Sequence, residues 1–336
     1  MTDLGKIDAD TFEHVIANNR GALRPDVRLG PTPGIDFGVL TVDDRALVCS
    51  TDPLSVPAAL GHERGARLAT DIVLADVAVS GVPPEHLAVG LNLPSDYDRQ
   101  SHAAIWRGIA AQANAFDVSL SAANPGRYPG VDSSWMGGAT AIGIGAHTDV
   151  VRPDGARPGD ALVISTGPGA EVAGLFAHLF PHALDLDEAE LSTARERLED
   201  IYVVEDALAA HAAGQITAMH DATEGGIAGG LIEMATGAGV RFELDRGSVP
   251  VRDGVSAVCQ AANVDPWQVT SCGTLLITVK QEDARSVVTA LETGGAPAAI
   301  VGQVSEGKGV IVDGERLVAP ETDPSWDAAA DLAAKE

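Results

Sequence analysis

The spacing of apolar residues along this chain predicts a mixture of helices and short strands. Between residues 65 and 79, for example, Ala69, Ile72, Val73 and Val77 recur at helical spacing and form one apolar face. The same criterion predicts helices over residues 9–18, 65–79, 102–116, 170–180, 188–213 and 226–238. Short apolar runs bounded by turn residues predict strands over residues 37–42, 46–50, 87–93, 140–146, 161–165, 215–219, 274–279 and 311–312.

The segment His220-Asp-Ala-Thr-Glu-Gly-Gly226 joins a predicted strand to a predicted helix. A helix N-terminus carries unpaired N–H groups and partial positive charge, and glycine lets a ligand approach the backbone closely. Gly225 and Gly226 at this position therefore predict a phosphate seat, beside which Asp221 could hold a divalent cation. The alternative is that Asp221 or Thr223 only caps the helix and the glycines only ease packing.

Two further aspartates are expected at one edge of a hairpin. Strands 37–42 and 46–50 are joined by a two-residue turn, with Asp36 before the first strand and Asp52 after the second. In an antiparallel hairpin these two ends lie together, which is costly for two carboxylates unless a cation or a proton lies between them. The alternative is that both are solvated turn residues.

Asp76 lies on the apolar stripe of the helix predicted over residues 65–79, four residues after Ile72 and seven after Ala69. A carboxylate on a buried stripe requires a partner, a metal or a raised pKa. A capping or salt-bridged role is the alternative. Asp71 points away from this stripe and is less diagnostic.

The length of 336 residues predicts two domains. A polar Pro/Gly turn over residues 152–160 is the expected boundary. We expect an N-terminal domain over 1–152, a C-terminal domain over 153–322 and a loose acidic tail over 323–336. No long apolar run and no basic-then-apolar leader is found in the sequence, so we expect a cytoplasmic protein without a membrane span.

The formal net charge is −26, with 22 basic and 48 acidic residues. Such a field repels phosphate backbones and argues against nucleic-acid partners. It is typical of a halophilic surface, on which hydrated carboxylates maintain solubility and ions screen their repulsion. The three cysteines, Cys49, Cys259 and Cys272, are scattered and predict neither a zinc site nor a disulfide framework.

Several segments, in order, resemble the superfamily of aminoimidazole ribonucleotide (AIR) synthetase (PurM), thiamine-monophosphate kinase (ThiL), selenophosphate synthetase (SelD) and the hydrogenase-maturation protein HypE. The likeness is closest to archaeal AIR-synthase-related, HypE-like proteins. It is carried by residues 34–40, 50–52, 68–71, 75–81, 140–143, 159–162 and 220–226. No single motif decides it, whereas the ordered set covers residues 5 to 320.

The resemblance implies a two-domain α+β, PurM-like fold, with dimer-forming antiparallel strands in the N-terminal domain and a mixed α/β C-terminal domain. It implies a homodimer that uses ATP and Mg²⁺ and acts on a small-molecule acceptor. The residues implied as metal ligands are Asp36, Asp52, Asp76 and Asp221. Those implied in cofactor binding are Gly34, Asp36, Thr51, Asp71, Asp76, Thr223, Gly225 and Gly226, and those implied in catalysis are Asp221 and Asn124.

The sequence also departs from this family. Asn124 lies where HypE-like proteins carry an acidic or imidazole group, in a segment expected to form a loop over residues 124–131. Ile35 replaces an acid, and the chain ends in Lys335-Glu336 where HypE has a carbamoyl-accepting cysteine. We therefore expect an ATP-dependent phosphotransferase or synthetase that activates an unidentified acceptor without carbamoyl transfer to a C-terminal cysteine. The alternatives are a thiamine-monophosphate-type kinase and a nucleotide-binding regulatory protein without turnover.

Overall fold

A computed structural model of the chain describes residues 4–131 and 134–336. They form two compact units. The N-terminal unit comprises Ile16–Thr32 and Asp36–Val150, and the C-terminal unit comprises Met1–Val15, Pro33–Ile35 and Val151–Glu336. None of the helices in the described residues has both the length and the apolar character needed to span a bilayer.

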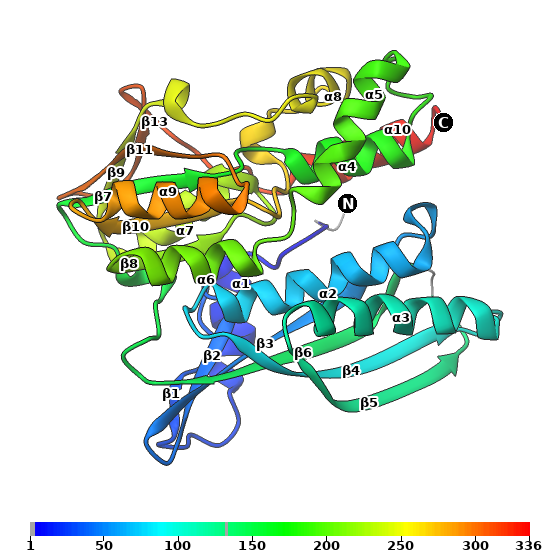
Figure 1. The fold of residues 1–336 in the computed structure, drawn as a ribbon, viewed down its shortest axis with the longest axis horizontal. Coiled ribbons are helices and arrows are strands. Elements are labelled where there is room, and N and C mark those ends of the chain that lie inside the picture. Colours follow the sequence, from blue (N-terminus) through cyan, green and yellow to red (C-terminus); the bar gives the residue numbers. More distant parts are fainter. Residues whose placement is uncertain (1–3, 132–133) are drawn as a thin grey trace. The chain divides into compact units, whose positions relative to one another are not determined.

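The N-terminal unit is built on a six-stranded sheet in the order β1-β2-β3-β6-β4-β5. Two helices, α2 (His62–Ala78) and α3 (Arg99–Ala115), lie side by side on one face of it (Figure 1). The strands are β1 (Val27–Leu29), β2 (Phe37–Val42), β3 (Arg45–Ser55), β4 (Pro84–Pro94), β5 (Ser119–Tyr128) and β6 (Trp135–Gly145), and a 3₁₀ turn η3 (Ala58–Leu60) precedes α2. The predicted helical stretch before β1 crosses the boundary between the units: α1 (Ala9–Thr11) and all but the last residue of η1 (Phe12–Ile16) belong to the C-terminal unit, and η2 (Ala17–Asn19) belongs to the N-terminal unit.

The contact between α2 and β3 orients this helix on the sheet. The Ser50 hydroxyl donates a hydrogen bond to the Val73 carbonyl at 3.1 Å. Near the other end of the contact, a Cβ on Gly65 would lie 3.1 Å from the Val56 side chain, so glycine favours the close approach there. Because Val56 lies near Gly65 and Ser50 lies near Val73, α2 and β3 run antiparallel.

The C-terminal unit is built on a seven-stranded sheet in the order β13-β12-β9-β11-β7-β10-β8. Its strands are β7 (Asp160–Ser165), β8 (Ile216–Asp221), β9 (Arg241–Leu244), β10 (Leu275–Lys280), β11 (Ala298–Ser305), β12 (Gly309–Val312) and β13 (Glu315–Arg316). Its helices are α4 (Ala170–Leu179), α5 (Glu188–Arg195), α6 (Val204–Ala213), α7 (Gly226–Ala238), α8 (Val255–Ala261), α9 (Ala284–Gly294) and α10 (Pro324–Ala333), with short 3₁₀ turns η4 (Pro153–Gly155), η5 (Glu196–Glu199), η6 (Arg246–Ser248) and η7 (Pro266–Gln268).

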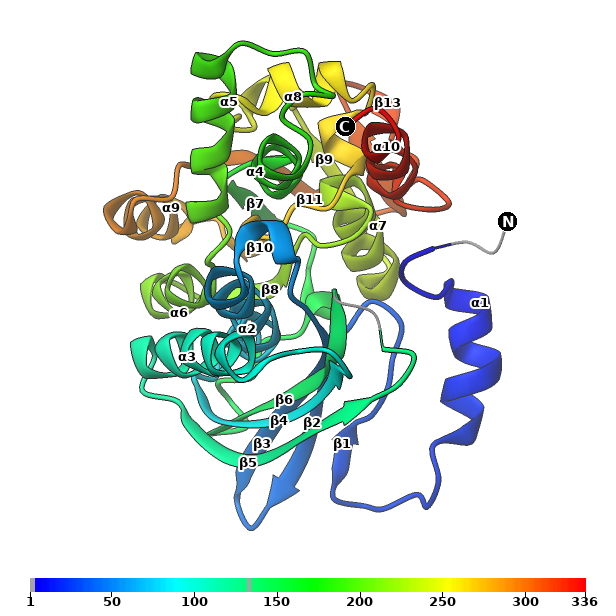
Figure 2. The same cartoon turned by 90° about the vertical axis from the view of Figure 1, so that its right-hand side faces the viewer.

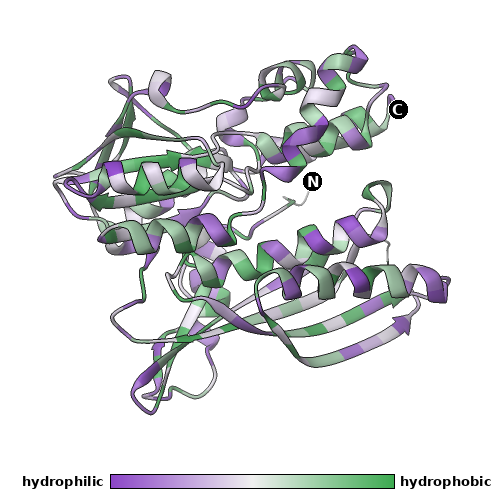
Figure 3. Cartoon of the chain, viewed as in Figure 1, coloured by the Kyte–Doolittle hydropathy of each residue, from purple (hydrophilic) through white to green (hydrophobic). Residues whose placement is uncertain are grey.

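Helices cover both faces of this second sheet. Figure 2 shows α7 on one side and α6 with α9 on the other. The predicted apolar stripe of α7, including Ile227, Leu231 and Met234, packs in one core with Leu162 and Ile164 of β7. Every residue of β7 is buried, and Figure 3 shows that the central strands are mostly hydrophobic. This pattern is typical of strands covered on both faces.

Two predicted elements are wrong. Residues 188–213 do not form one helix, because α5 and α6 are separated by η5 and a turn. In that turn the Asp200 carboxylate forms ion pairs with Arg197 and Arg252, at 2.9 and 2.7 Å. Residues 124–128, expected as part of a loop, belong to the edge strand β5, which pairs in parallel with β4. An edge strand tolerates Pro125 because one side of its backbone needs no partner.

The tail over residues 323–336 was expected to be loose and is instead helical. Asp323 accepts a hydrogen bond from the Ser325 N–H and caps α10. Ala328 and Leu332 are buried in a cluster with residues of α4, α5 and α8. At its end, the Glu336 carboxylate accepts hydrogen bonds from two backbone N–H groups, of His182 and Ala183. Burial of its apolar stripe explains why an acidic, alanine-rich segment is ordered.

Candidate functional site

Asp221 is the last residue of β8, where the strand turns into α7. Its side chain is only 3% exposed. Oδ1 is buried and accepts no hydrogen bond from the described residues; His220 Nδ1 lies 3.5 Å from it. An ionised carboxylate oxygen in such a place is costly unless a cation compensates it. The position predicted from the sequence to hold a cation is therefore electrostatically suited to one.

His220 lies between two carboxylates. Its ring is buried, with Nδ1 toward Asp221 and Nε2 3.1 Å from Oε2 of Glu233 on α7. Gly34 has φ +73°, and a Cβ there would lie 3.2 Å from the Glu233 Cβ. Gly34 thus packs against the helix that carries Glu233. Local sequence patterns indicate no role for His220 or Glu233, since their pairing depends on the packing of α7 on β8.

The backbone N–H groups at the start of α7 have partners within the chain. Gly225 donates to Oδ2 of Asp323 at 2.8 Å, and Gly226 donates to the Thr223 carbonyl at 2.9 Å. A Cβ on Gly226 would lie 2.5 Å from the Val269 carbonyl oxygen, so this glycine is needed for close packing. A phosphate at Gly225 would have to replace the Asp323 carboxylate.

Two more carboxyl groups surround this helix start. Burial raises the pKa of Glu224, although the Lys6 N–H donates to its carboxylate and opposes the rise, and the Asp323 charge adds to it. Burial also raises the pKa of Glu171, which accepts hydrogen bonds from the Thr270 hydroxyl and the Cys272 N–H. A phosphate entering this acidic surrounding requires an accompanying cation.

The three predicted aspartates of the N-terminal unit occupy different positions along α2 and β3. Asp76 is buried on α2, three residues beyond Val73, whereas Asp52 lies two residues beyond Ser50 on β3. Because these elements are antiparallel and Ser50 contacts Val73, Asp52 and Asp76 are on the order of 10 Å apart along them. Asp36 is half-buried beside β2, near the β3 end that carries Asp52, since Phe37 pairs with Ser50.

No group of three or more His, Cys, Asp or Glu side chains suited to hold a metal occurs among the described residues. A preformed cage around a single ion is thus not found within residues 4–131 and 134–336. Mg²⁺ does not require one, because it commonly binds one or two carboxylates together with water and substrate phosphates. The roles assigned to Asp36, Asp52 and Asp76 stay predictions.

Three other predicted site residues, Asp71, Thr51 and Asn124, lie in different surroundings in the N-terminal unit. Asp71 is buried and accepts a hydrogen bond from the Gln112 side chain of α3 at 2.7 Å, which ties the two helices together. The Thr51 hydroxyl lies 2.9 Å from that of Thr140. Because side chains alternate along β3, Thr51 and Asp52 point to opposite faces of the sheet. Asn124 is exposed on β5, and its catalytic role stays a prediction.

Asp323 is a further residue of this site that sequence reasoning missed, after His220 and Glu233. Its signal was present, since aspartate followed by proline is a common start of a helix, with aspartate as the cap and proline in the first turn. The acidic composition after Pro320 outweighed this signal in the prediction. Only the fold brings Asp323 to Gly225, 98 residues away in the sequence.

The order of these motifs agrees with known family domains. Residues 34–144 match the AIR synthase related protein N-terminal domain, and residues 157–315 match the C-terminal domain. The chain belongs to the AIR synthase related family. This membership confirms the two-domain PurM-like fold expected from the ordered motifs.

Relatives of this family cover most of the chain. A carbamoyl dehydratase HypE of Rhizobium leguminosarum is 30% identical over 283 residues, covering 81% of this chain and 77% of the relative. A Methanocaldococcus jannaschii protein, provisionally named for hydrogenase expression and formation, is 26% identical and covers 94% of this chain and 93% of its own length.

Solved structures show the same fold. Escherichia coli HypE superposes with a TM-score of 0.72 at 25% identity, over 83% of this chain and 87% of that one. A ThiL structure complexed with AMPPCP and TMP gives a TM-score of 0.71 at 21% identity, over 86% and 90%. A HypE structure in complex with ATP gives 0.67 at 22% identity, over 93% and 91%.

Proposed function

We propose that this chain is a Mg²⁺-dependent enzyme that uses ATP to phosphorylate an oxygen of a small acceptor, activating it for transfer or dehydration. The relatives named above support this proposal, because one is described in complex with ATP and another with an ATP analogue. Family membership supports ATP-dependent chemistry in general. It leaves the acceptor to be identified by experiment, since acceptors are held by loops that differ between members of a fold family.

The observation that carries the proposal is the Asp221 carboxylate. A structural role predicts hydrogen bonds to both oxygens, as Asp160 has within the same sheet. Asp221 Oδ1 has none from the described residues, although its side chain is 3% exposed. A buried acceptor without a donor is stabilised by a bound cation.

The residues present fit a metal–nucleotide complex better than a bare anion. Asp221 is the candidate Mg²⁺ ligand of the C-terminal unit, and Asp36, Asp52 and Asp76 are the candidate Mg²⁺ ligands of the N-terminal unit. When bound, Mg²⁺ neutralises phosphate charge and aligns the transferred group with its acceptor. The carboxyl groups of Glu224 and Asp323 would exclude phosphates that arrive without a cation.

The remaining site residues have smaller proposed roles. Gly34 and Gly226 allow the close backbone packing that shapes the site, while Thr223 and Thr51 offer hydroxyl groups. We retain Asp71 and Gly225 as candidate cofactor contacts and Asn124 as a candidate catalytic residue. Asp71 would have to act while bonded to Gln112, and Gly225 only after release of Asp323.

We also propose that the protein acts as a homodimer built on the N-terminal sheet. The face of this sheet opposite α2 carries Leu40, Leu47, Cys49, Ile142 and Ile144, all half-buried in the isolated chain. Strand pairing places Leu47 opposite Leu40 and Ile144, and Cys49 opposite Ile142, so these side chains form one patch. A second copy of the same face would bury this apolar patch.

The test is to measure binding of Mg²⁺ with a non-hydrolysable ATP analogue to wild-type protein and to Asp221→Asn. We expect the substitution to weaken binding by roughly tenfold or more, since it removes the charge and preserves the shape. It should leave thermal stability unchanged or raised, because an uncompensated buried charge is removed. Asp185→Asn, an exposed aspartate in the same unit, is the matched control.

Equal nucleotide affinity for wild type and Asp221→Asn would place the metal elsewhere. Asp76→Asn tests the N-terminal half of the proposal in the same way. Mg²⁺ should promote binding at far lower concentration than K⁺ at matched ionic strength, and equal potency would indicate only charge screening. Measuring ADP release with a panel of acceptors tests the kinase alternative, since a thiamine-monophosphate-type kinase would release ADP with thiamine monophosphate as the acceptor. Binding without ADP release would favour a regulatory protein.

A further inference from the structure

A separate hollow lies at the other end of α7, in the C-terminal unit. Its volume is about 450 Å³, within the range of small-molecule sites. Ala235 of α7 and Val310 of β12, which are fully or almost fully buried, form its floor, and the half-buried Leu317 also lines it. Val318 at the rim is 68% exposed. The floor and one rim of this hollow are therefore apolar.

The charged groups of this hollow are all cationic. Lys308 and Arg316 line it, and neither side chain forms a hydrogen bond or ion pair with any residue in 4–131 or 134–336. No aspartate or glutamate is among its lining residues. In a chain with 48 acidic and 22 basic residues, two cations without acidic partners at one hollow form a local exception to the negative field.

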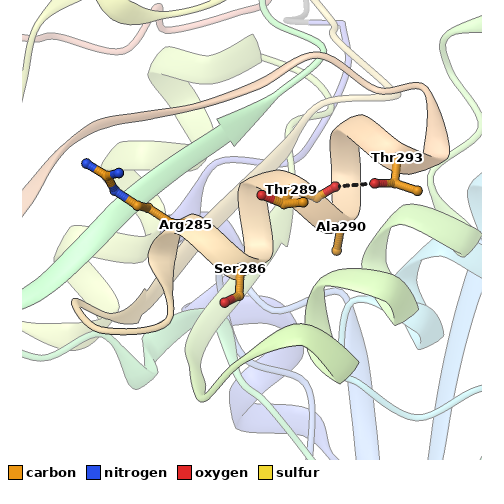
Figure 4. Close-up of a pocket in the computed structure, with 5 residues that line it drawn as sticks. All are labelled: Arg285, Ser286, Thr289, Ala290 and Thr293. Carbon is orange, nitrogen blue, oxygen red and sulfur yellow. Dashed lines mark hydrogen bonds between the residues drawn. The ribbon is translucent and has the colours of Figure 1, made fainter.

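Two other hollows of the C-terminal unit lack this combination. One, of about 610 Å³ on the sheet, is lined by the acidic residues Glu243, Asp245 and Asp313. Another, of about 590 Å³, is lined by residues of α9 alone, with Arg285 pointing away from the helix (Figure 4). A surface formed by one helix cannot enclose a ligand. An apolar floor and paired cations occur together only at the α7–β12 hollow among these three.

This hollow is distinct from the Asp221 site. Asp221 precedes the first turn of α7, whereas Gly239 at the hollow follows its last turn. At 1.5 Å per residue, the helix separates the two by about 20 Å. A ligand at the hollow would contact neither Asp221 nor the start of α7.

We propose that the α7–β12 hollow binds a small organic anion with an apolar body, the anionic group bound by Lys308 and Arg316. Arginine offers a planar pair of donors to a carboxylate or phosphate oxygen, and lysine adds a point charge. The apolar body would cover Ala235 and Val310 and contact Val318. The proposal is independent of the nucleotide reaction, since none of these residues belongs to the Asp221 site.

The test uses octanoate as the probe, with 1-octanol and inorganic phosphate as partial probes, in calorimetric titrations of the full chain. Octanoate should bind more tightly than either partial probe, because it alone combines the charge with the apolar body. The variant Lys308→Gln/Arg316→Gln should weaken octanoate binding by roughly tenfold. Both side chains are exposed and have no partner among the described residues, so thermal melting should be unchanged. Arg285→Gln is the matched control and should bind octanoate as wild type does.

Three results would overturn the inference. Unchanged octanoate affinity in the double variant would show that the cations are not the site. Octanol binding as tight as octanoate would exclude recognition of the charge, and phosphate binding as tight as octanoate would exclude use of the apolar floor. Loss of nucleotide binding in Asp221→Asn with octanoate affinity retained would confirm that the two sites are separate.

Discussion

The two sheets of this protein differ in how many of their faces are covered by helices. In the C-terminal unit, α7 covers one face and α6 with α9 covers the other, so β7 is buried along its whole length. In the N-terminal unit, α2 and α3 cover one face, and the opposite face keeps Leu47 and Ile142 half-exposed. The C-terminal sheet has both faces covered within one chain. The N-terminal sheet presents a face that a further partner could bury.

Two buried aspartates of the C-terminal sheet, Asp160 and Asp221, differ in their hydrogen-bond partners. Asp160, at the start of β7, is fully buried and bonded on both oxygens by Lys280, Thr217 and the Arg157 N–H. Asp221, at the end of β8, is almost as buried and has an oxygen without a donor from the described residues. A satisfied carboxylate stabilises a fold, whereas an unsatisfied one indicates a ligand. Both belong to one sheet, so the difference reflects local chemistry.

The largest expected effect concerns the face of the N-terminal sheet that lies opposite α2. Replacing Ile142 by Asp should weaken the proposed dimer by roughly a hundredfold or more, because a carboxylate would be buried without a partner. Light scattering over a concentration series in molar salt measures this. Ile300→Asp, at an exposed position of β11 in the other sheet, is the control and should leave association unchanged. A wild-type chain that is monomeric at all concentrations would contradict the dimer.

The second effect concerns the ion pair between Lys280 and Asp160 in the C-terminal sheet. Lys280→Met should cost about 3 kcal/mol of unfolding free energy, since Asp160 would remain buried without its cation. Partial exposure of Lys280, at 34%, keeps the cost at the low end of what buried pairs show. Denaturant unfolding measures it. Lys308→Met, an exposed lysine of the same unit, should cost little; equal losses in the two variants would show that the ion pair contributes nothing specific.

The third effect depends on pH. Burial, with a smaller contribution from the Glu205 charge, raises the pKa of Asp206 from 3.8 to about 6. Ionisation is therefore easier in the unfolded chain, so stability falls as pH rises from about 4 to 6 and stays lower above that. Asp206→Asn should raise stability at pH 7 by about 2 kcal/mol, after allowance for partial exposure, and should have no such effect below pH 4. Thermal melts at several pH values decide this. Glu205→Gln should raise stability at pH 7 by a smaller amount, because it removes only the contribution of the Glu205 charge.

The smallest effect concerns the C-terminal helix. Asp323→Ala should cost about 1–2 kcal/mol, because it removes the cap of α10 and the acceptor of the Gly225 N–H together. Asp323→Asn keeps an oxygen acceptor and should cost less. Denaturant unfolding of both variants measures the difference. If Asp323→Ala is neutral, the tail helix is held by its apolar contacts alone.

Local patterns predicted most elements that carry their own signal. The spacing of Ile227, Leu231 and Met234 predicted α7, and Gly239 ends it in the left-handed conformation. The hairpin of β2 and β3 followed from two apolar runs and an Asp-Asp turn, whose first residue has φ +54°. The strands β9 and β11, whose local patterns are weak, were not predicted, because their formation depends on burial against neighbours distant in the sequence. The helix α9 was also not predicted, although its buried residues Ala284, Val287 and Leu291 recur at helical spacing.

The sequence by itself determined the family, the order of its motifs and the helix and strand that flank Asp221. It also placed Asp76 on a buried stripe. Only the tertiary structure decided which acids are satisfied: that Lys280 neutralises Asp160, that Gln112 bonds to Asp71, and that Asp323 bonds to Gly225. The physical reason is that periodicity is a local property of the chain. The partners of a buried charge come from segments that meet only after folding.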